Sequence, residues 1–255
     1  MRYTLEALPL PISMCFTLVT GGSGGVGQYV VAGLKGKVVV LDKEPPLHGT
    51  YVSCDLTKLD QVKQVTEAIV KEHGVPNKLI FNAGYHKSAL LEDSHDFMDM
   101  MKINLLSIHE IMRILIPLIS NTDCHIVMTG SVCAFTVAPG GVPYCCTKAA
   151  LLAYANGLRY ELKDAGVKVS ILLPGHIKTG MFKSFRVAFP WLMPSLEPEY
   201  VGKEIVRLVE SESSTIWMWP LYVYMAPLLT VLPPWLFFPI SHYMGVDTSI
   251  LNSGQ

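Results

Sequence analysis

Long runs of like charge are missing from this sequence. Its 20 Lys and Arg residues balance 21 Asp and Glu residues over 255 positions, so the formal net charge is only −1. Proteins that bind nucleic acid gather basic side chains on one face, because those side chains neutralise the phosphates. The composition therefore predicts no nucleic-acid partner.

Cysteine pairs and histidines at metal-binding spacing are also missing. The six cysteines include no CxxC pair, and the eight histidines form no zinc-type pattern with them. We predict no metal site and reduced thiols that face the cytosol. The first twenty residues contain an acidic residue and two prolines but no signal-peptide cleavage pattern, so we expect a chain that is not secreted.

What the sequence does contain is a series of short apolar runs separated by longer helix-like segments. Six such runs occupy residues 15–19, 37–42, 51–55, 78–84, 125–130 and 168–175. Continuous apolar strands that alternate with helices are typical of a parallel sheet covered on both faces. We predict an α/β fold with a Rossmann-type doubly wound parallel sheet, and the length suits a single domain.

The spacing of the runs predicts the organisation of the chain. Helices are expected at 59–74 and 96–120. Asp42 and Asp55 are only thirteen positions apart, and the stretch between them holds two prolines, which predicts a loop. Residues 1–212 are predicted to form the dinucleotide-binding catalytic domain, with a substrate loop at 180–200. Residues 213–255 are predicted to be an apolar C-terminal segment rich in proline and aromatic residues.

A glycine-rich turn follows the first predicted strand, and a helix-like segment follows the turn. Gly21, Gly25 and Gly27 would let the backbone approach a pyrophosphate held at the positive end of that helix. The alternative, a flexible linker, is disfavoured by the position of the turn between a strand and a helix.

Asp42 ends the second strand, twenty-one residues after Gly21. A carboxylate at this spacing accepts hydrogen bonds from the ribose hydroxyls of NAD and repels the extra phosphate of NADP. We predict NAD in preference to NADP, although the adjacent Lys43 keeps NADP open and an aspartate that merely caps a turn is the simpler alternative.

Several motifs in the same order resemble the classical short-chain dehydrogenase/reductase family. They are TGxxxGxG from Thr20, "CDLT" from Cys54, "NAG" from Asn82, "KINLL" from Lys102, "TGSV" from Thr129, Tyr144 with Lys148, and "PGHIKT" from Pro174. The resemblance implies the catalytic residues Asn104, Ser131, Tyr144 and Lys148. It also implies a cofactor site made by Gly21, Ser23, Gly25, Val26, Gly27, Asp42, Asp55, Leu56, Asn82, Ala83, Gly84, Tyr144, Lys148, Pro174, Gly175, Ile177 and Thr179.

Tyr144 and Lys148 are four residues apart, so on a helix they project from one face. A neighbouring ammonium and the positive charge of a bound nicotinamide would favour the phenolate and lower the tyrosine pKa. The phenol could then exchange a proton with an alcohol or its carbonyl as hydride moves. Ser131 would orient the substrate oxygen, and the resemblance implies that Asn104 bends its helix around a water that leads to Lys148.

The region after Thr179 predicts an apolar substrate. It carries the bulky residues Met181, Phe182, Phe185, Phe189, Trp191, Leu192 and Met193, although these side chains could simply pack on the core. The region and the closing "HYMGVDTSI" look similar to the retinol and hydroxysteroid dehydrogenase branch, which implies a retinoid, steroid or long-chain alcohol. The alternatives are a reductase of a small polar carbonyl and a regulatory nucleotide-binding protein.

The C-terminal segment has no Asp, Glu, Lys or Arg from Ser213 to Val246. Five prolines within it argue against a membrane-spanning helix, because lipid cannot satisfy the backbone groups that proline leaves unpaired. We predict short amphipathic pieces at a membrane or lipid-droplet surface, on the cytoplasmic side of the endoplasmic reticulum. We also expect a homodimer or tetramer. The alternative location is soluble in the cytoplasm, with the segment completing the pocket and the subunit interface.

Overall fold

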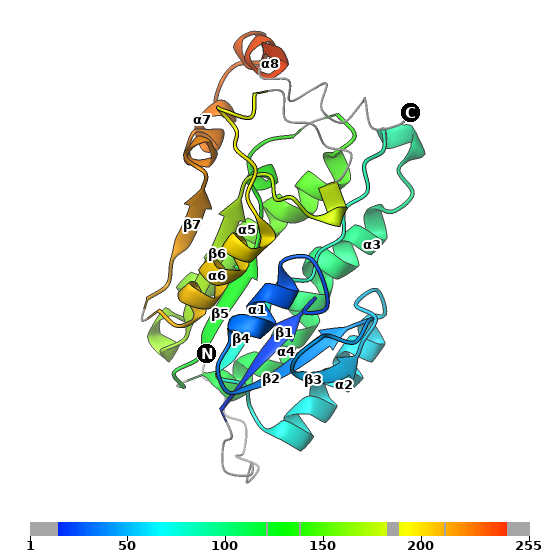
Figure 1. Ribbon diagram of the computed structural model, residues 1–255, viewed down its shortest axis with the longest axis vertical. Helices are drawn as coiled ribbons and strands as arrows, with labels where there is room; N and C mark the ends of the chain where they lie inside the picture. The colour runs from blue at the N-terminus through cyan, green and yellow to red at the C-terminus, as the bar shows by residue number, and fades with distance from the viewer. Residues whose placement is uncertain (1–14, 121, 138, 183–188, 212, 244–255) are drawn as a thin grey trace.

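Seven parallel strands form one sheet in the order β3-β2-β1-β4-β5-β6-β7, as Figure 1 shows. The computed structural model describes residues 15–120, 122–137, 139–182, 189–211 and 213–243. The strands are β1 Phe16–Thr20, β2 Lys37–Asp42, β3 Thr50–Ser53, β4 Lys78–Phe81, β5 His125–Thr129, β6 Lys168–Pro174 and β7 Ile216–Trp219. The predicted doubly wound parallel sheet in a single domain is confirmed.

Each central strand divides its side chains between two hydrophobic cores, because successive residues of a strand point to opposite faces. Leu18, Leu79 and Ile126 belong to one core, whereas their neighbours Val19, Ile80 and Val127 belong to the other. The first core is covered by α2 (Leu59–His73), α4 (Ser107–Ile119) and α5 (Val142–Glu161), and the second by α1 (Gly27–Gly33) and α6 (Pro198–Val209). Burial on both faces explains why these strands read as continuous apolar runs.

The connection from β2 to β3 contains no helix, as its length and prolines predict. The long helix predicted at 96–120 consists of three pieces: α3 (Phe97–Met101), a π-helical turn at Lys102–Leu106, and α4. Asn104 lies inside the π turn and is buried. A π turn adds one residue to a helix and turns the side chains within it, and such turns are frequent at functional sites.

The apolar C-terminal segment begins inside the sheet. Its first residues form β7, which pairs with β6 from Ile171↔Ile216 to Pro174↔Trp219. Three short helices follow, at Leu221–Tyr224 (η6), Ala226–Leu229 (α7) and Pro234–Tyr243 (α8), and Figure 1 shows α7 and α8 beyond the carboxyl end of β7. Prolines divide the segment into these pieces, because proline breaks the hydrogen bonding of a helix interior.

The remaining short helices are η1 (Leu91–Asp93), η3 (Val132–Ala134), η4 (Lys163–Ala165) and η5 (Gly180–Phe182). No helix among the described residues is long and apolar enough to span a membrane. Residues 1–14, residues 183–188 of the predicted substrate loop with Phe185, and residues 244–255 with most of the closing motif lie outside the described residues.

Candidate active site

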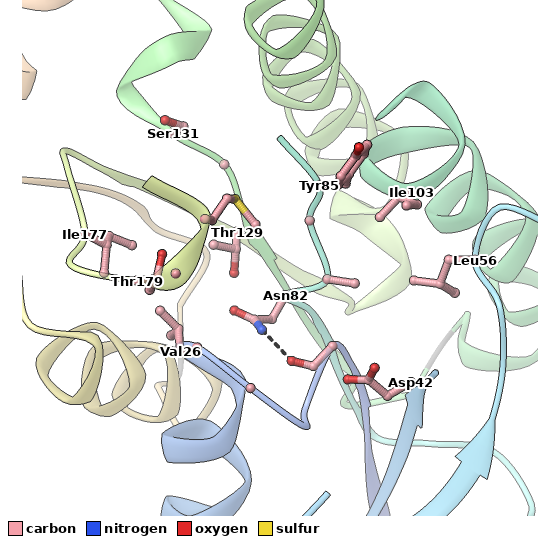
Figure 2. A pocket seen from close by; sticks show the side chains of 18 of the residues that line it. Val26, Asp42, Leu56, Asn82, Tyr85, Ile103, Thr129, Ser131, Ile177 and Thr179 are labelled. Atoms are coloured by element: carbon pink, nitrogen blue, oxygen red, sulfur yellow. Dashed lines mark hydrogen bonds between the residues drawn. The ribbon is translucent and has the colours of Figure 1, made fainter. Parts of the chain in front are cut away.

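A cleft of about 530 Å³ opens at the carboxyl edge of the sheet. Its walls come from the residues that follow β1, β2, β4, β5 and β6, which all end at this edge because the strands are parallel. The connections after β1 and β4 lead away in opposite directions, and open α/β sheets bind ligands at such a switch point. In Figure 2, Val26, Ile177 and Thr179 lie on one side of the cleft, and Leu56, Ile103 and Tyr85 on the other.

Two glycines of the turn after β1 pack too tightly for a side chain, whereas Gly24 has open space around it. Gly21 has a positive φ of 69°, and a Cβ there would lie 2.5 Å from the Cα of Ala83. A Cβ on Gly27 would overlap the carbonyl oxygen of Gly21. Asn82 donates from Nδ2 to that same carbonyl at 2.9 Å, the dashed contact in Figure 2, and so joins the turn to the end of β4. The backbone of the turn is thus exposed to whatever the cleft binds.

Asp42 ends β2 with its carboxylate held by the backbone. The carboxylate accepts hydrogen bonds from the amides of Lys43 at 2.7 Å and Ser23 at 3.0 Å. Asp42 lines the cleft, and the ammonium of Lys43 forms an ion pair with Asp55 at 3.2 Å. The negative charge at this end of the cleft therefore has a fixed position.

Tyr144 and Lys148 project from the first turns of α5, and both side chains are buried. Pro143 stands in the first turn of the helix, where a missing backbone N–H costs nothing. Ser131 follows β5, is also buried, and hydrogen-bonds to the phenol of Tyr144. The ammonium nitrogen of Lys148 lies 5.6 Å from the centre of the Tyr144 ring. These three residues meet at the opposite end of the cleft from Asp42.

Burial controls the pKa of Tyr144. Desolvation raises the pKa of this phenol above its ordinary value of 10, and the hydrogen bond with Ser131 opposes that rise only in part. The lowered pKa expected from the sequence is therefore wrong for the protein chain by itself. The phenol is a proton donor at neutral pH unless a positive charge is brought into the cleft.

Lys148 is held by the strand next to its helix. Its Nζ donates to the backbone carbonyl of Thr129, at the end of β5, over 2.8 Å. Burial lowers the pKa of this ammonium from 10.5 to about 8, and the thiol of Cys133 works in the opposite direction. The lysine is thus charged at neutral pH at a considerable desolvation cost.

Asn104 connects the π turn to two neighbouring segments. Its Oδ1 accepts from the backbone N–H of Tyr85 at 2.8 Å, and its Nδ2 donates to the Tyr85 carbonyl and to Thr147 Oγ1 at 3.0 and 2.9 Å. The side chain therefore fixes the backbone just after Gly84 against α5. The water path to Lys148 that the resemblance implies stays a prediction.

Most of the residues singled out from the sequence line the cleft. They are Gly21, Gly25, Val26, Asp42, Leu56, Asn82, Ala83, Gly84, Ser131, Tyr144, Lys148, Pro174, Gly175, Ile177 and Thr179. Ser23, Gly27, Asp55 and Asn104 do not line it but support residues that do. Asp55, for example, pairs with Lys43 and accepts from the N–H and hydroxyl of Thr57 at 3.0 and 2.7 Å.

Several residues of the site escaped the sequence analysis. Leu41, Cys54, Tyr85, Ile103 and Thr129 line the cleft, and their positions within or directly beside the recognised motifs are the signal that identifies them. Met181, predicted as a substrate-loop residue, lines the cleft as well. His86 packs edge-on against the Tyr144 ring at 4.7 Å, and burial lowers the pKa of its imidazole to about 4. Cys133 contacts Ser131 and Cys145 beside the tyrosine. Only the tertiary fold places His86 and Cys133 there.

The shape and polarity of the cleft fit a dinucleotide. The glycine turn leaves room for a pyrophosphate at the backbone, the Asp42 carboxylate suits a ribose, and Lys148 with Tyr144 supplies a donor and a proton at the far end. Among the residues described, no group of three or more His, Cys, Asp or Glu side chains is arranged to hold a metal ion.

The model of the short chain dehydrogenase family matches residues 16–188, which is more than half of the chain. The chain belongs to this family. Human "Short-chain dehydrogenase/reductase 3" is 29% identical to it, over 91% of this chain and 83% of the relative. Mouse "Epidermal retinol dehydrogenase 2" is also 29% identical, over 76% of this chain and 65% of the relative. The resemblance to the retinol and hydroxysteroid dehydrogenase branch is thus confirmed.

A solved structure shows the same fold as this family member. A 3-ketoacyl-(acyl-carrier-protein) reductase from Brucella melitensis, in complex with NADH, superposes with a TM-score of 0.71 at 22% identity. The superposition covers 81% of this chain and 96% of the reductase. At this identity the likeness shows the fold and leaves the substrate open.

The buried ammonium of Lys148 predicts how stability depends on pH. Between its folded pKa of about 8 and its ordinary value of 10.5, the unfolded chain keeps a proton that the folded chain has lost. Stability contributed through this group therefore rises with pH across that window, by at most about 1.4 kcal/mol per pH unit. We expect the free energy of unfolding, measured with urea, to differ between wild type and Lys148→Met by an amount that rises with this slope from pH 8 to 10.

The difference between the two proteins cancels groups that titrate alike in both. Cys133 is the exception, because its pKa is lowered to about 7 first by the hydrogen bond with Cys145 and in part by the charge of Lys148, so both proteins are compared in a Cys133→Ala background. A flat difference across this window would mean that Lys148 keeps an ordinary pKa.

Proposed function

We propose that this family member is an NAD-dependent oxidoreductase that interconverts a lipophilic alcohol and its carbonyl by hydride transfer. The observation that carries the proposal is the buried contact of Ser131, Tyr144 and Lys148 beside a cleft with a dinucleotide-type glycine turn. A bound nicotinamide would accept or return the hydride. A purely regulatory nucleotide-binding protein has no need of a buried tyrosine at this position.

The protein's own residues would supply the proton and orient the substrate oxygen. The Ser131 hydroxyl can donate to the substrate oxygen and hold it beside the Tyr144 phenol. In carbonyl reduction the phenol, protonated because its pKa is raised by burial, gives its proton to that oxygen. In the reverse direction the oxygen returns the proton, and the Lys148 ammonium, 5.6 Å from the ring, stabilises the phenolate that accepts it.

The apolar surroundings of the cleft support a retinoid, steroid or long-chain substrate. Met181 lines the cleft, and Phe189, Trp191 and Leu192 follow in the same connection between β6 and α6. A relative in the retinol dehydrogenase branch supports the same substrate class. Apolar side chains around a few polar groups are the usual composition of a site for a large lipophilic ligand.

A substrate screen with two proteins tests this proposal. We expect NAD-dependent turnover of a retinoid, steroid or long-chain alcohol, in detergent micelles, and faster than that of small sugar alcohols. Tyr144→Phe should lower turnover by at least about 100-fold, the usual contribution of a general acid or base, and leave NADH binding within about twofold. Tyr154→Phe, on the same helix but facing His109, is the matched control and should retain activity.

If the protein turned over only small polar carbonyls, the lipophilic substrate would be wrong and the alternative, a reductase of small carbonyl compounds, would be favoured. Nearly full activity of Tyr144→Phe would remove the proposed mechanism altogether.

NAD is proposed as the cofactor because Asp42 places a carboxylate at the ribose end of the cleft. The nearest cation, Lys43, is engaged with Asp55 at 3.2 Å, and no other lysine or arginine of the described residues lines that end. A 2′-phosphate there would meet a fixed negative charge, which the backbone N–H groups of Ser23, Lys43 and Glu44 keep in place.

Removing the Asp42 carboxylate and strengthening the neighbouring cation should change the preference between NAD and NADP. Asp42→Ala combined with Lys43→Arg removes the repulsion and adds a bidentate phosphate donor, so we expect the NADP-to-NAD ratio of kcat/KM to rise roughly tenfold or more. Asp42→Asn, which keeps the shape of the side chain, should give part of that rise. Wild-type protein that uses NADP as well as NAD would contradict the assignment.

The C-terminal segment is proposed to lie at a membrane or lipid-droplet surface on the cytoplasmic side of the endoplasmic reticulum. Its short helices and the turns between them expose large apolar side chains: Leu221, Met225, Leu228, Val231, Trp235, Phe238 and Tyr243. Trp191 and Leu192 are exposed as well. An exposed apolar set of this size, on elements that stand beyond the sheet, is typical of an interaction surface.

Vesicle flotation tests this location. Wild-type protein should float with neutral phosphatidylcholine vesicles and stay bound at high salt, because the attraction is mainly apolar. Replacing Trp235 and Phe238 with Ser should weaken binding at least about tenfold, since each exposes a large ring in the free protein. Tyr160→Ser removes an equally exposed ring from the end of α5 and serves as the control.

Wild-type protein that stays out of the vesicle fraction, as a homodimer or tetramer, would instead assign these side chains to a subunit interface.

A further inference from the structure

The loop after β6 is held from two sides. On one side it joins the start of α6: Leu196 donates from its backbone N–H to the carbonyl of His176 at 2.8 Å, and Lys178 donates to the carbonyl of Leu196 at 2.9 Å. On the other side it joins the C-terminal segment, where Gly175 donates to the carbonyl of Trp219 at 2.9 Å. Pro174, Gly175 and the residues after them form one wall of the cleft.

A tyrosine of the C-terminal segment completes the second attachment. The hydroxyl of Tyr222 accepts a hydrogen bond from the backbone N–H of His176 at 3.0 Å. The phenol packs so closely on Gly175 that a Cβ on that residue would overlap its hydroxyl group. Tyr222 does not line the cleft, so it contacts the loop from behind.

The short helix that carries Tyr222 is firmly anchored at this point. Val223 is fully buried, and its backbone N–H donates to the carbonyl of Pro220 at 2.9 Å. Burial raises the pKa of the Tyr222 phenol, whereas the hydrogen bond from His176 lowers it. Tyr224, two residues on in the same helix, is 48% exposed. The two tyrosines thus differ in environment although they share one element.

We propose that Tyr222 is a positioning residue for the dinucleotide, which fixes the backbone of Gly175 and His176 so that this wall of the cleft is already in place when the dinucleotide binds. The inference rests on the proposed nucleotide site. A loop that must be ordered on binding weakens affinity, and a loop held in its bound conformation avoids that loss. The apolar C-terminal segment would then contribute to cofactor binding without contacting the cofactor.

The removal of one oxygen atom tests this role. Tyr222→Phe keeps the ring and leaves the His176 amide without its acceptor. We expect full-length Tyr222→Phe to bind NADH roughly threefold to tenfold more weakly, the effect of losing one buried hydrogen bond, in a fluorescence titration without substrate. Tyr224→Phe, the matched control from the same helix, should bind NADH like wild type.

Amide hydrogen exchange separates positioning from a general loss of stability. In Tyr222→Phe the peptide that contains Gly175 and His176 should exchange faster, whereas peptides from β4 and β5 should keep their protection. The KM for NAD should rise while kcat at saturating NAD stays near that of wild type. A merely structural role would instead weaken protection throughout the sheet and lower the unfolding midpoint without this local change.

A second pair of variants tests the close contact itself. Gly175→Ala should weaken NADH binding in wild type, because the new methyl group displaces the Tyr222 hydroxyl. In a Tyr222→Leu background the same methyl group should do less harm, so the double variant should bind NADH more tightly than the product of the two single effects predicts.

Each outcome has a distinct meaning. If wild type binds NADH and Tyr222→Phe binds it equally well with unchanged exchange, the inference is wrong and the proposed function stands. If wild type binds neither NADH nor NADPH, the nucleotide site and the inference both fail. If NADH binds as expected but no alcohol or carbonyl is turned over, the proposed reaction fails and the role of Tyr222 stands.

Discussion

The parallel direction of all seven strands is the constraint on which the site depends. Because every strand ends at the same edge, residues that are far apart in the chain meet there: Gly21 after β1, Asn82 after β4 and Ser131 after β5. The direct contacts are short, as in the 2.9 Å hydrogen bond from Asn82 to the Gly21 carbonyl. A single change of strand direction would move one of these groups to the opposite end of the molecule.

Burial of charge gives the site its chemical character. Lys148 and Tyr144 have almost no contact with water, so burial favours the neutral form of each side chain. The pKa of the ammonium is therefore lowered and that of the phenol is raised. The Thr129 carbonyl and the Ser131 hydroxyl compensate part of this cost by hydrogen bonding. In such surroundings one added charge changes the proton affinity of the tyrosine far more than it would in water. A cofactor that carries or loses a positive charge is therefore well suited to control proton transfer here.

The C-terminal segment has a buried side and an exposed side, although in the sequence it is one continuous apolar stretch. Its buried side holds β7 and Tyr222 against the wall of the cleft, whereas its outer side exposes rings such as Trp235 and Phe238. The same few elements thus contact both the cofactor loop and the surroundings of the protein.

The sequence by itself determined the fold and much of the site. Apolar strand runs at the right spacing require a sheet covered on both faces, and the glycine turn with Asp42, or Tyr144 with Lys148, carries its chemistry within a few neighbouring residues. Local patterns of this kind survive folding because the backbone alone sets their geometry.

Only the tertiary structure decided the rest. It placed β7 in the sheet, because an apolar stretch with five prolines gives no clear period from which an edge strand can be recognised. It brought His86 to the ring of Tyr144 and Tyr222 to the back of Gly175, contacts between distant segments that no local pattern records. It also raised the pKa of Tyr144 in the protein without a cofactor, because the degree of burial depends on every element packed around the residue.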